Sequence, residues 1–166
     1  MYKITLVVAM DNNGVIGKGG KVPWKLRRDM KHFADTTIGK TVVMGRKTYE
    51  SLPANFKPLP NRRNMILTND SEFLAPNCTI LRYVAEILEL SRTEEVFVIG
   101  GGQIYRQLMP YANKIIMTDV DAEIEGGDTF FPNIGPEWKG RLLWRQEVDS
   151  RNDFAFWVVE HIRAVR

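Results

Sequence analysis

The chain has 166 residues, of which 44% are hydrophobic and 26% are charged, and its formal net charge at pH 7 is +3. These values are typical of a globular protein and exclude disordered, collagen-like and coiled-coil chains. We expect one domain over residues 1–166, because a chain of this length buries a full core by itself. Cys78 is the single cysteine. It excludes an intrachain disulfide and favours a reducing compartment.

The start of the chain is typical of a strand and not of a signal peptide, because apolar residues begin at position 2 without a cationic leader. No apolar run approaches the ~18 residues of a membrane helix. We therefore expect a cytoplasmic protein with no membrane partner. The 23 basic and 20 acidic residues are interspersed, so the weak positive charge does not predict a nucleic-acid partner.

Runs rich in Val, Ile and Phe predict strands at 4–10, 41–44, 64–68, 96–99, 114–120, 141–149 and 154–162. The first five runs are almost continuously apolar, which favours parallel strands buried on both faces. The last two flank a polar turn at 150–153 and predict an antiparallel hairpin. Helical patterns lie at 25–35, 46–52, 84–91 and 103–108. The pattern predicts an α/β fold with a mixed, mostly parallel sheet.

Two irregular stretches separate these elements. Residues 11–23 contain four glycines, and residues 53–61 contain three prolines. Long loops in a compact domain are often functional, although surface filler is the commoner explanation of any one loop.

Two histidines and one cysteine are too few for several kinds of reactive site. They offer no convincing nucleophilic triad, and their spacing matches no zinc motif, so we expect no bound metal. Glycines follow apolar runs at Gly45 and at 100–102, each before a helical pattern. Such turns expose backbone N–H groups that bind phosphate. Neither turn matches G-x-G-x-x-G, and a purely structural tight turn remains an alternative for both.

Asp29 is the most informative single residue. Leu26, Met30 and Phe33 define the apolar stripe of the helix predicted at 25–35, and Asp29 lies one turn after Leu26. A half-buried carboxylate there needs a hydrogen-bonding ligand or a polar neighbour. The alternative is an acid at the edge of the stripe that reaches solvent.

Five sequence blocks resemble those of a known family, and they occur in the family's order. They are Pro23-Trp24 with Leu26 and Asp29, the run at 43–51 (VMGRKTYES), the run at 59–64 (LPNRRN), the run at 99–105 (IGGGQIY) and the run at 127–132 (GDTFFP). Ala9, residues 15–17 and Thr118 fit as well. Together they resemble the dihydrofolate reductase family, in its single-function bacterial form.

The resemblance implies a fold and a reaction. It implies a central sheet of about eight strands with flanking helices, and a monomer. The reaction would be reduction of 7,8-dihydrofolate to 5,6,7,8-tetrahydrofolate by a hydride from NADPH, which supports one-carbon metabolism and the synthesis of thymidylate and purines. Asp29 would orient the pterin ring, and the proton added at N5 would come from water.

The resemblance also assigns residues to the site. Asp29, Trp24 and Thr118 would be catalytic, with Asp29 accepting hydrogen bonds from the pterin 2-amino group and a ring nitrogen. Arg62 would pair with the substrate's α-carboxylate, and we expect its neighbour Arg63 to be a solvated charge. The residues that would bind substrate are Val7, Val8, Ala9, Met30, Phe33, Leu52, Leu59, Arg62 and Ile99.

A longer set would bind the cofactor NADPH. Its members are Ala9, Ile16, Gly17, Gly45, Arg46, Lys47, Thr48, Leu67, Thr68, Asn69, Ile99, Gly100, Gly101, Gly102, Gln103, Ile104 and Tyr105. The family carries a cis bond at the position of Gly100-Gly101, and the loop at 18–24 would form a mobile lid.

The sequence departs from the family at three places. Asp70 follows Asn69, so selection of the extra phosphate of NADPH depends on Arg46 and Lys47. Val22 is smaller than the Met or Leu common at that lid position. The Gly126-Gly127 pair is one residue longer than the usual single glycine, which puts lid contacts through Asp128 in question.

Two other functions are alternatives. One is an NADPH-dependent reductase of the same fold that acts on a riboflavin-pathway pyrimidine, which would have little use for Asp29 and Arg62 together. The other is a non-catalytic nucleotide-binding or RNA-binding module, which the scattered charge and the absence of an aromatic-basic RNA motif disfavour.

Overall fold

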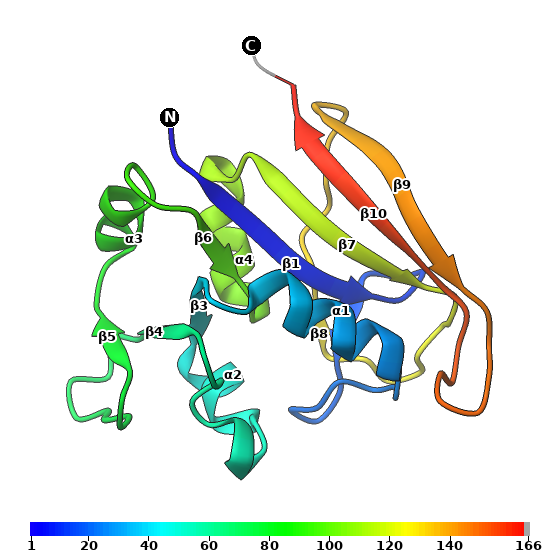
Figure 1. Cartoon of the computed structure of the whole chain (residues 1–166), viewed down its shortest axis with the longest axis horizontal. Coiled ribbons are helices and arrows are strands. Elements are labelled where there is room, and N and C mark those ends of the chain that lie inside the picture. Colours follow the sequence, from blue (N-terminus) through cyan, green and yellow to red (C-terminus); the bar gives the residue numbers. More distant parts are fainter. Residues whose placement is uncertain (165–166) are drawn as a thin grey trace.

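The structure, a computed structural model, describes residues 1–164. Within this range the chain forms an eight-stranded sheet, whose strands appear from left to right in Figure 1 in their spatial order. They are β5 (Thr79–Leu81), β4 (Arg63–Leu67), β3 (Thr41–Gly45), β6 (Val96–Val98), β1 (Ile4–Met10), β7 (Lys114–Val120), β10 (Phe156–Arg163) and β9 (Trp138–Gln146).

Strand directions confirm the predicted mixed sheet. The pairs from β5 across to β7 are parallel, and β1 lies inside the sheet with β6 on one side and β7 on the other. β10 is antiparallel to both β7 and β9, as the C-terminal hairpin pattern predicts. The register places Ala9 of β1 and Val158 of β10 on either side of Thr118 in β7.

Some strand limits differ from the prediction. β9 starts earlier than the predicted range 141–149, where Trp138 pairs with Arg163 of β10. It also ends earlier, because the Asp149 carboxylate accepts the Arg151 N–H (2.8 Å) and bends the chain into a turn. β5, β2 (Val15–Gly17) and β8 (Thr129–Phe130) were not predicted. They are two or three residues long, too short to show a period. β2 and β8 form a separate antiparallel pair.

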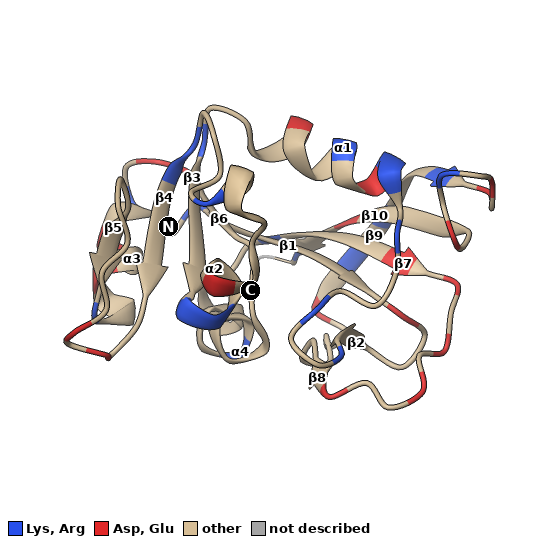
Figure 2. Cartoon of the chain, turned by 90° about the horizontal axis from the view of Figure 1, so that it is seen from below, with Lys and Arg blue, Asp and Glu red and all other residues tan. Residues whose placement is uncertain are grey.

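Helices cover both faces of the sheet. Their bounds are α1 (Arg27–Thr37), α2 (Arg46–Ser51), α3 (Val84–Leu90) and α4 (Gly102–Leu108), with short 3₁₀ helices η1 (Ala54–Phe56) and η2 (Met109–Tyr111). Phe33 of α1 and Tyr49 of α2 pack in one hydrophobic cluster, whereas Ile87 of α3 and Leu108 of α4 pack in another. Figure 2 shows α1 on one side of the sheet, and α4 with the β2–β8 pair on the other.

The apolar stripe predicted for α1 is partly wrong. Leu26 is 2% exposed, but Met30 is 65% exposed. Met30 is exposed because this face of the helix borders an open cleft and not the packed core. The helix also starts two residues later than predicted, since Leu26 forms a bridge to Asn152 in the β9–β10 turn.

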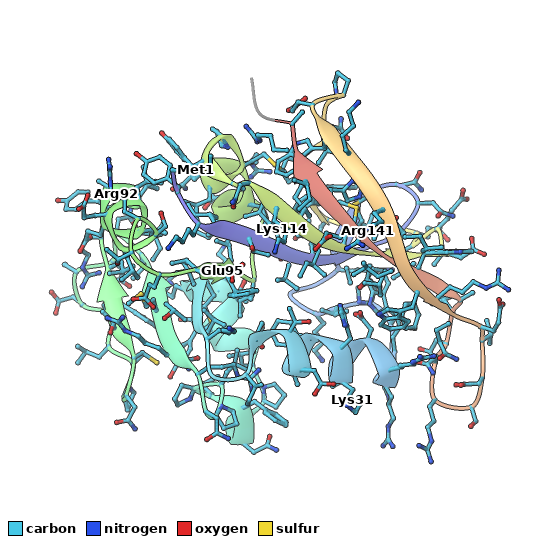
Figure 3. All side chains as sticks on the ribbon, turned by 45° about the horizontal axis from the view of Figure 1, so that its top comes forward. Met1, Lys31, Arg92, Glu95, Lys114 and Arg141 are labelled. Atoms are coloured by element: carbon cyan, nitrogen blue, oxygen red, sulfur yellow. The ribbon has the colours of Figure 1, made fainter. Side chains whose placement is uncertain are left out.

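Charged side chains form small pairs of opposite sign on the outer surfaces. Lys114 Nζ lies 3.9 Å from Glu95 Oε1, and Arg141 Nη2 lies 2.9 Å from Glu160 Oε1. Figure 3 shows Lys114 near Glu95 beside the sheet, and Figure 2 shows acidic and basic positions interspersed along the chain. In residues 1–164, no helix has the length and apolar character needed to cross a membrane.

Candidate active site

A single large cleft, of about 1430 Å³, gathers the residues that the resemblance singled out. All of the catalytic, substrate-binding and cofactor-binding residues named above line it. Sites for one small molecule usually measure about 300–1,000 Å³. The cleft is therefore large enough for two ligands side by side.

Asp29 lies at the floor of this cleft, bonded to the central sheet. Thr118, 3% exposed on β7, donates its hydroxyl to Asp29 Oδ1 at 2.6 Å. Burial raises the pKa of Asp29 from 3.8 to about 6, and the hydrogen bond from Thr118 opposes part of that rise. Asp29 is therefore not a solvated acid at the edge of a helix.

Trp24 closes the cleft beside this pair. It is 9% exposed and packs in a cluster with Leu26, Val120 and Phe156. The packing fixes the indole ring against the end of the sheet. Trp24 thus shapes the wall of the cleft next to Asp29.

Apolar side chains and one arginine form the next part of the cleft. Val7 and Leu59 are buried there, with Phe33, Leu52 and Ile99 packed against the same cluster. Arg62 lies at the outer end. Its Nη1 donates to Thr37 Oγ1 at 3.0 Å, and its Nε donates to the Pro60 carbonyl at 3.0 Å. The guanidinium is thereby held at the rim beside an apolar slot.

Arg63 is exposed, as predicted for a solvated charge. Its Nη1 lies 2.9 Å from Glu94 Oε1, in an exposed ion pair. Arg63 does not line the cleft. The two neighbouring arginines therefore face different surroundings.

The two glycine turns contact each other at the opposite end of the cleft. Gly45 N donates to the Gly100 carbonyl at 2.9 Å, and the Gly100–Gly101 peptide bond is cis. A Cβ at Gly45 would lie 3.0 Å from Ile104, and one at Gly101 would lie 3.3 Å from the Thr48 hydroxyl. Both distances are shorter than ordinary van der Waals contact, so a side chain at either glycine would displace its neighbour.

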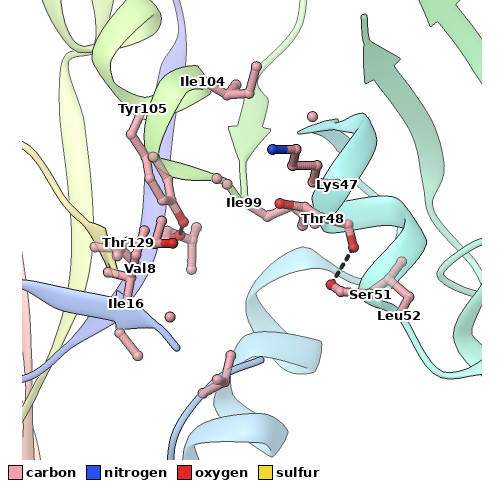
Figure 4. A pocket seen from close by; sticks show the side chains of 18 of the residues that line it. Val8, Ile16, Lys47, Thr48, Ser51, Leu52, Ile99, Ile104, Tyr105 and Thr129 are labelled. Atoms are coloured by element: carbon pink, nitrogen blue, oxygen red, sulfur yellow. Dashed lines mark hydrogen bonds between the residues drawn. The ribbon is translucent and has the colours of Figure 1, made fainter. Parts of the chain in front are cut away.

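Figure 4 shows the space between these turns. Lys47 and Thr48 reach it from α2, Leu52 reaches it from the residue just after α2, and Tyr105 reaches it from α4. The Tyr105 hydroxyl is buried and donates to the Val7 carbonyl at 2.5 Å. α2 and α4, the helices that follow the two turns, also start without a hydrogen bond from a capping side chain. Backbone N–H groups there are open to an anionic ligand.

Charged residues surround this end of the cleft, and one of them was not predicted. Arg46 Nη1 lies 2.8 Å from Asp70 Oδ2. Arg82 donates to the carbonyls of Thr68 and Asp70 and also lines the cleft. Arg82 directly follows β5 and therefore lies at the carboxyl edge of the sheet. Because β5 was not predicted from the sequence, this position of Arg82 was not predicted either.

The lid loop is bound to the segment that contains the longer glycine pair. Gly19 N donates to Asp128 Oδ2 at 2.8 Å, and Asp128 N donates to the Gly17 carbonyl at 3.1 Å. The Gly19 N–H and the Thr129 hydroxyl, which donates to Asp128 Oδ1 at 2.9 Å, lower the pKa of the Asp128 carboxyl group. A Cβ at Gly127 would lie 2.5 Å from Val15. The Gly126-Gly127 pair therefore leaves the lid contact through Asp128 in place, although the sequence had put that contact in question.

Asp11, which sequence reasoning missed, anchors the base of the same loop. It is buried, and its carboxylate accepts N–H groups from Asn13 (2.8 Å), Val15 (2.9 Å) and Ile124 (2.7 Å). The available signal was an acid before Asn-Asn-Gly, a sequence typical of a turn that a carboxylate stabilises.

Comparison with known proteins gives one consistent result. Residues 3–163 match the family profile described as dihydrofolate reductase. The chain is 41% identical over 148 residues to a dihydrofolate reductase of Mycobacterium tuberculosis, covering 87% of this chain and 90% of that protein. It is 43% identical over 157 residues to that of Bacillus subtilis, covering 92% and 90%.

A solved structure agrees with these sequence matches. A dihydrofolate reductase from Enterococcus faecalis, complexed with NADP(H) and RAB-propyl, superposes with a TM-score of 0.88 at 35% identity. The match covers 98% of this chain and 99% of that one.

Proposed function

The chain belongs to the dihydrofolate reductase family and reduces dihydrofolate with NADPH, and we propose that Asp29 is the group that binds and orients the pterin. The observation that supports this role is the half-buried Asp29 carboxylate at the floor of the cleft, which accepts a hydrogen bond from Thr118 and has a pKa of about 6. Strongly perturbed carboxylates in clefts are typical of functional sites.

Asp29 has the right shape for the heterocycle. A carboxylate offers two coplanar acceptors, which match an amino group and a ring N–H side by side. Thr118 holds one oxygen and fixes the plane of the group. The negative charge also favours a protonated pterin ring, so Asp29 promotes protonation at N5 without contacting that atom.

The turn residues fit an anionic dinucleotide. We propose that the glycine turns, Thr48 and the cations Arg46 and Lys47 hold the phosphates of NADPH. The fit rests on two closely packed turns, in which a Cβ would crowd its neighbours, and on uncapped N–H groups beside them. When bound, NADPH supplies the hydride that reduces C6 of the pterin. The lid loop would exclude bulk water from the reacting rings.

Three further proposals extend beyond the reaction. We propose that residues 1–166 form one domain, that the protein is a monomer and that it is cytoplasmic. The support is one continuous eight-stranded sheet across residues 1–164, a single cysteine and the absence of a membrane-length helix in that range. Size-exclusion chromatography with light scattering tests the monomer.

Loss of NADPH absorbance that depends on added dihydrofolate tests the reaction. Replacing dihydrofolate by a riboflavin-pathway pyrimidine tests the rival reductase, and replacing NADPH by NADH tests the cofactor. Oxidation of NADPH only with the pyrimidine would refute the assignment. The paired positions of Asp29 and Arg62 along one cleft favour dihydrofolate.

We expect 2,4-diaminopyrimidines to inhibit competitively with dihydrofolate. A protonated diamino ring offers Asp29 the same paired donors as the pterin, with an added charge. Initial rates at several concentrations of both compounds check the mode of inhibition. Noncompetitive inhibition, or none, would count against the pterin pocket at Asp29.

We expect Arg62→Leu to raise the KM for dihydrofolate with little change in NADPH binding. Loss of a charge-assisted pair at the partly exposed rim corresponds to roughly 1.5–3 kcal/mol, or about 10- to 100-fold in KM. Arg63→Leu is the matched control, because it removes a neighbouring cation outside the cleft. Equal effects of the two changes would place Arg62 among the surface charges.

A further inference from the structure

The start of α1 lacks a cap of its own. Leu26 occupies the N-cap position and makes no side-chain capping bond. Arg27 and Arg28 follow, and their charges are unfavourable at the positive end of a helix dipole. The local sequence thus gives a weak start to the turn that contains Asp29.

The turn between β9 and β10 supplies the missing partners. Asn152 Oδ1 accepts the Arg28 N–H at 3.1 Å, and the Arg151 carbonyl accepts the Arg27 N–H at 3.1 Å. These two N–H groups have no acceptor within the helix. Figure 1 shows the β9–β10 turn beside this end of α1. A segment distant in sequence therefore caps the helix.

A second set of bonds joins the same two segments. Lys25 N donates to Asp153 Oδ2 at 2.9 Å, and Asp153 N donates to the Lys25 carbonyl at 3.0 Å. Leu26 and Asn152 form an antiparallel bridge between them. The residues just before α1 are thus bonded to the hairpin on both sides of Asn152.

The orientation of the Asn152 amide is fixed by its own partners. The side chain is 3% exposed, and its Nδ2 donates to Asp149 Oδ1 at 2.9 Å. Since the donor end is directed at a carboxylate, the acceptor end is directed at the Arg28 N–H. Asn152 therefore satisfies both ends of its amide only in this arrangement.

The same hairpin also holds the partner of Asp29. Val158 of β10 pairs with Thr118 of β7, and Thr118 donates to Asp29 at 2.6 Å. The β9–β10 hairpin therefore positions both partners of the Thr118–Asp29 hydrogen bond. It positions Thr118 by pairing β10 with β7, and it positions Asp29 by capping α1.

We propose that Asn152 is a positioning residue for the reduction, because its cap on α1 holds the Asp29 carboxylate against Thr118 within the cleft. The proposal rests on the proposed role of Asp29. Without the cap, the first turn of α1 frays and Asp29 moves toward solvent. Burial is the main cause that raises the pKa of Asp29, so fraying lowers that pKa from about 6 toward 3.8.

The test compares Asn152→Ala with Asn113→Ala. Asn113 is a matched control, because its Oδ1 also accepts a backbone N–H at 3.1 Å, from Ile4, and it does not line the cleft. We expect both variants to melt at a lower temperature than wild type. We expect only Asn152→Ala to raise the KM for dihydrofolate, by about three- to tenfold, the effect of losing one helix cap.

The titration of Asp29 gives a readout independent of activity. Carbon-13 NMR of its carboxyl group in the ligand-free protein should show a lower midpoint in Asn152→Ala and a wild-type midpoint in Asn113→Ala. A wild-type midpoint together with a wild-type KM in Asn152→Ala would overturn the proposal. If the wild-type protein failed to reduce dihydrofolate, the proposed function would be refuted. The NMR titration of Asp29 would still test the cap, because it does not depend on activity.

Asp153→Ala provides a milder change, in case Asn152→Ala does not fold. Asp153 is exposed, and its side chain bonds only the Lys25 N–H among the described residues. We expect a smaller shift of the Asp29 midpoint in the same direction, with the fold intact. If Asn152→Ala yields no folded protein, an unchanged Asp29 midpoint in Asp153→Ala would overturn the proposal.

Discussion

Asp29→Asn should lower kcat/KM for dihydrofolate at neutral pH by about 100-fold or more, the loss expected for two charge-assisted hydrogen bonds at 1.5–3 kcal/mol each. The amide would present an NH₂ to a ring donor, leaving both unsatisfied in a largely apolar pocket. The charge that favours a protonated pterin is lost as well. Hydride transfer should therefore recover partly as the pH falls and the substrate is protonated by solvent.

The measurement is single-turnover hydride transfer from pH 5 to 9 in both proteins, with NADPH affinity as a control. A pH profile and rate equal to wild type would contradict the role of Asp29.

Asp29→Asn should raise the free energy of unfolding even though it lowers activity. The folded-state pKa of Asp29 is about 6 against an ordinary value of 3.8, so the ionised carboxylate lowers the free energy of unfolding above pH 6. Below pH 3.8 the group is protonated in both states and the penalty is absent. We expect Asp29→Asn to gain about 1–3 kcal/mol of stability at pH 7 and nothing at pH 3.5. Loss of stability at pH 7 would show that other packing defects dominate.

Arg46→Leu should raise the KM for NADPH by about 10- to 100-fold while changing the KM for NADH less than about threefold. The reason is that Arg46 borders the cleft where a phosphate would compete with Asp70 for its guanidinium. Steady-state kinetics with both cofactors check the result. Arg141→Leu is the control, since Arg141 makes a similar pair with Glu160 on the outer hairpin.

Asp70→Asn tests the same arrangement from the other side. It removes a negative charge that both occupies Arg46 and repels a phosphate. We expect NADPH to bind a few-fold more tightly, with NADH unchanged. Weaker NADPH binding would mean that Asp70 mainly orients Arg46.

Several parts of the fold and site could be predicted from the sequence. Buried parallel strands need apolar side chains on both faces, so β1 and β7 were predicted at their observed limits. The glycine turns could be located as well, because glycines directly follow the apolar runs that form β3 and β6. The blocks around Asp29, Arg46 and Gly100 identified the family, and its known site located the residues of the cleft.

Other features depended on the tertiary structure, because their partners lie far apart in the chain. Thr118 and Asp29 are 89 positions apart, and Asn152 and Arg28 are 124 apart. β2 and β8 exist only because Val15 and Phe130 meet. Periodicity reports only which face of an element is apolar. The raised pKa of Asp29 and its external cap arise from burial and hydrogen bonds that only the packed sheet and hairpin create.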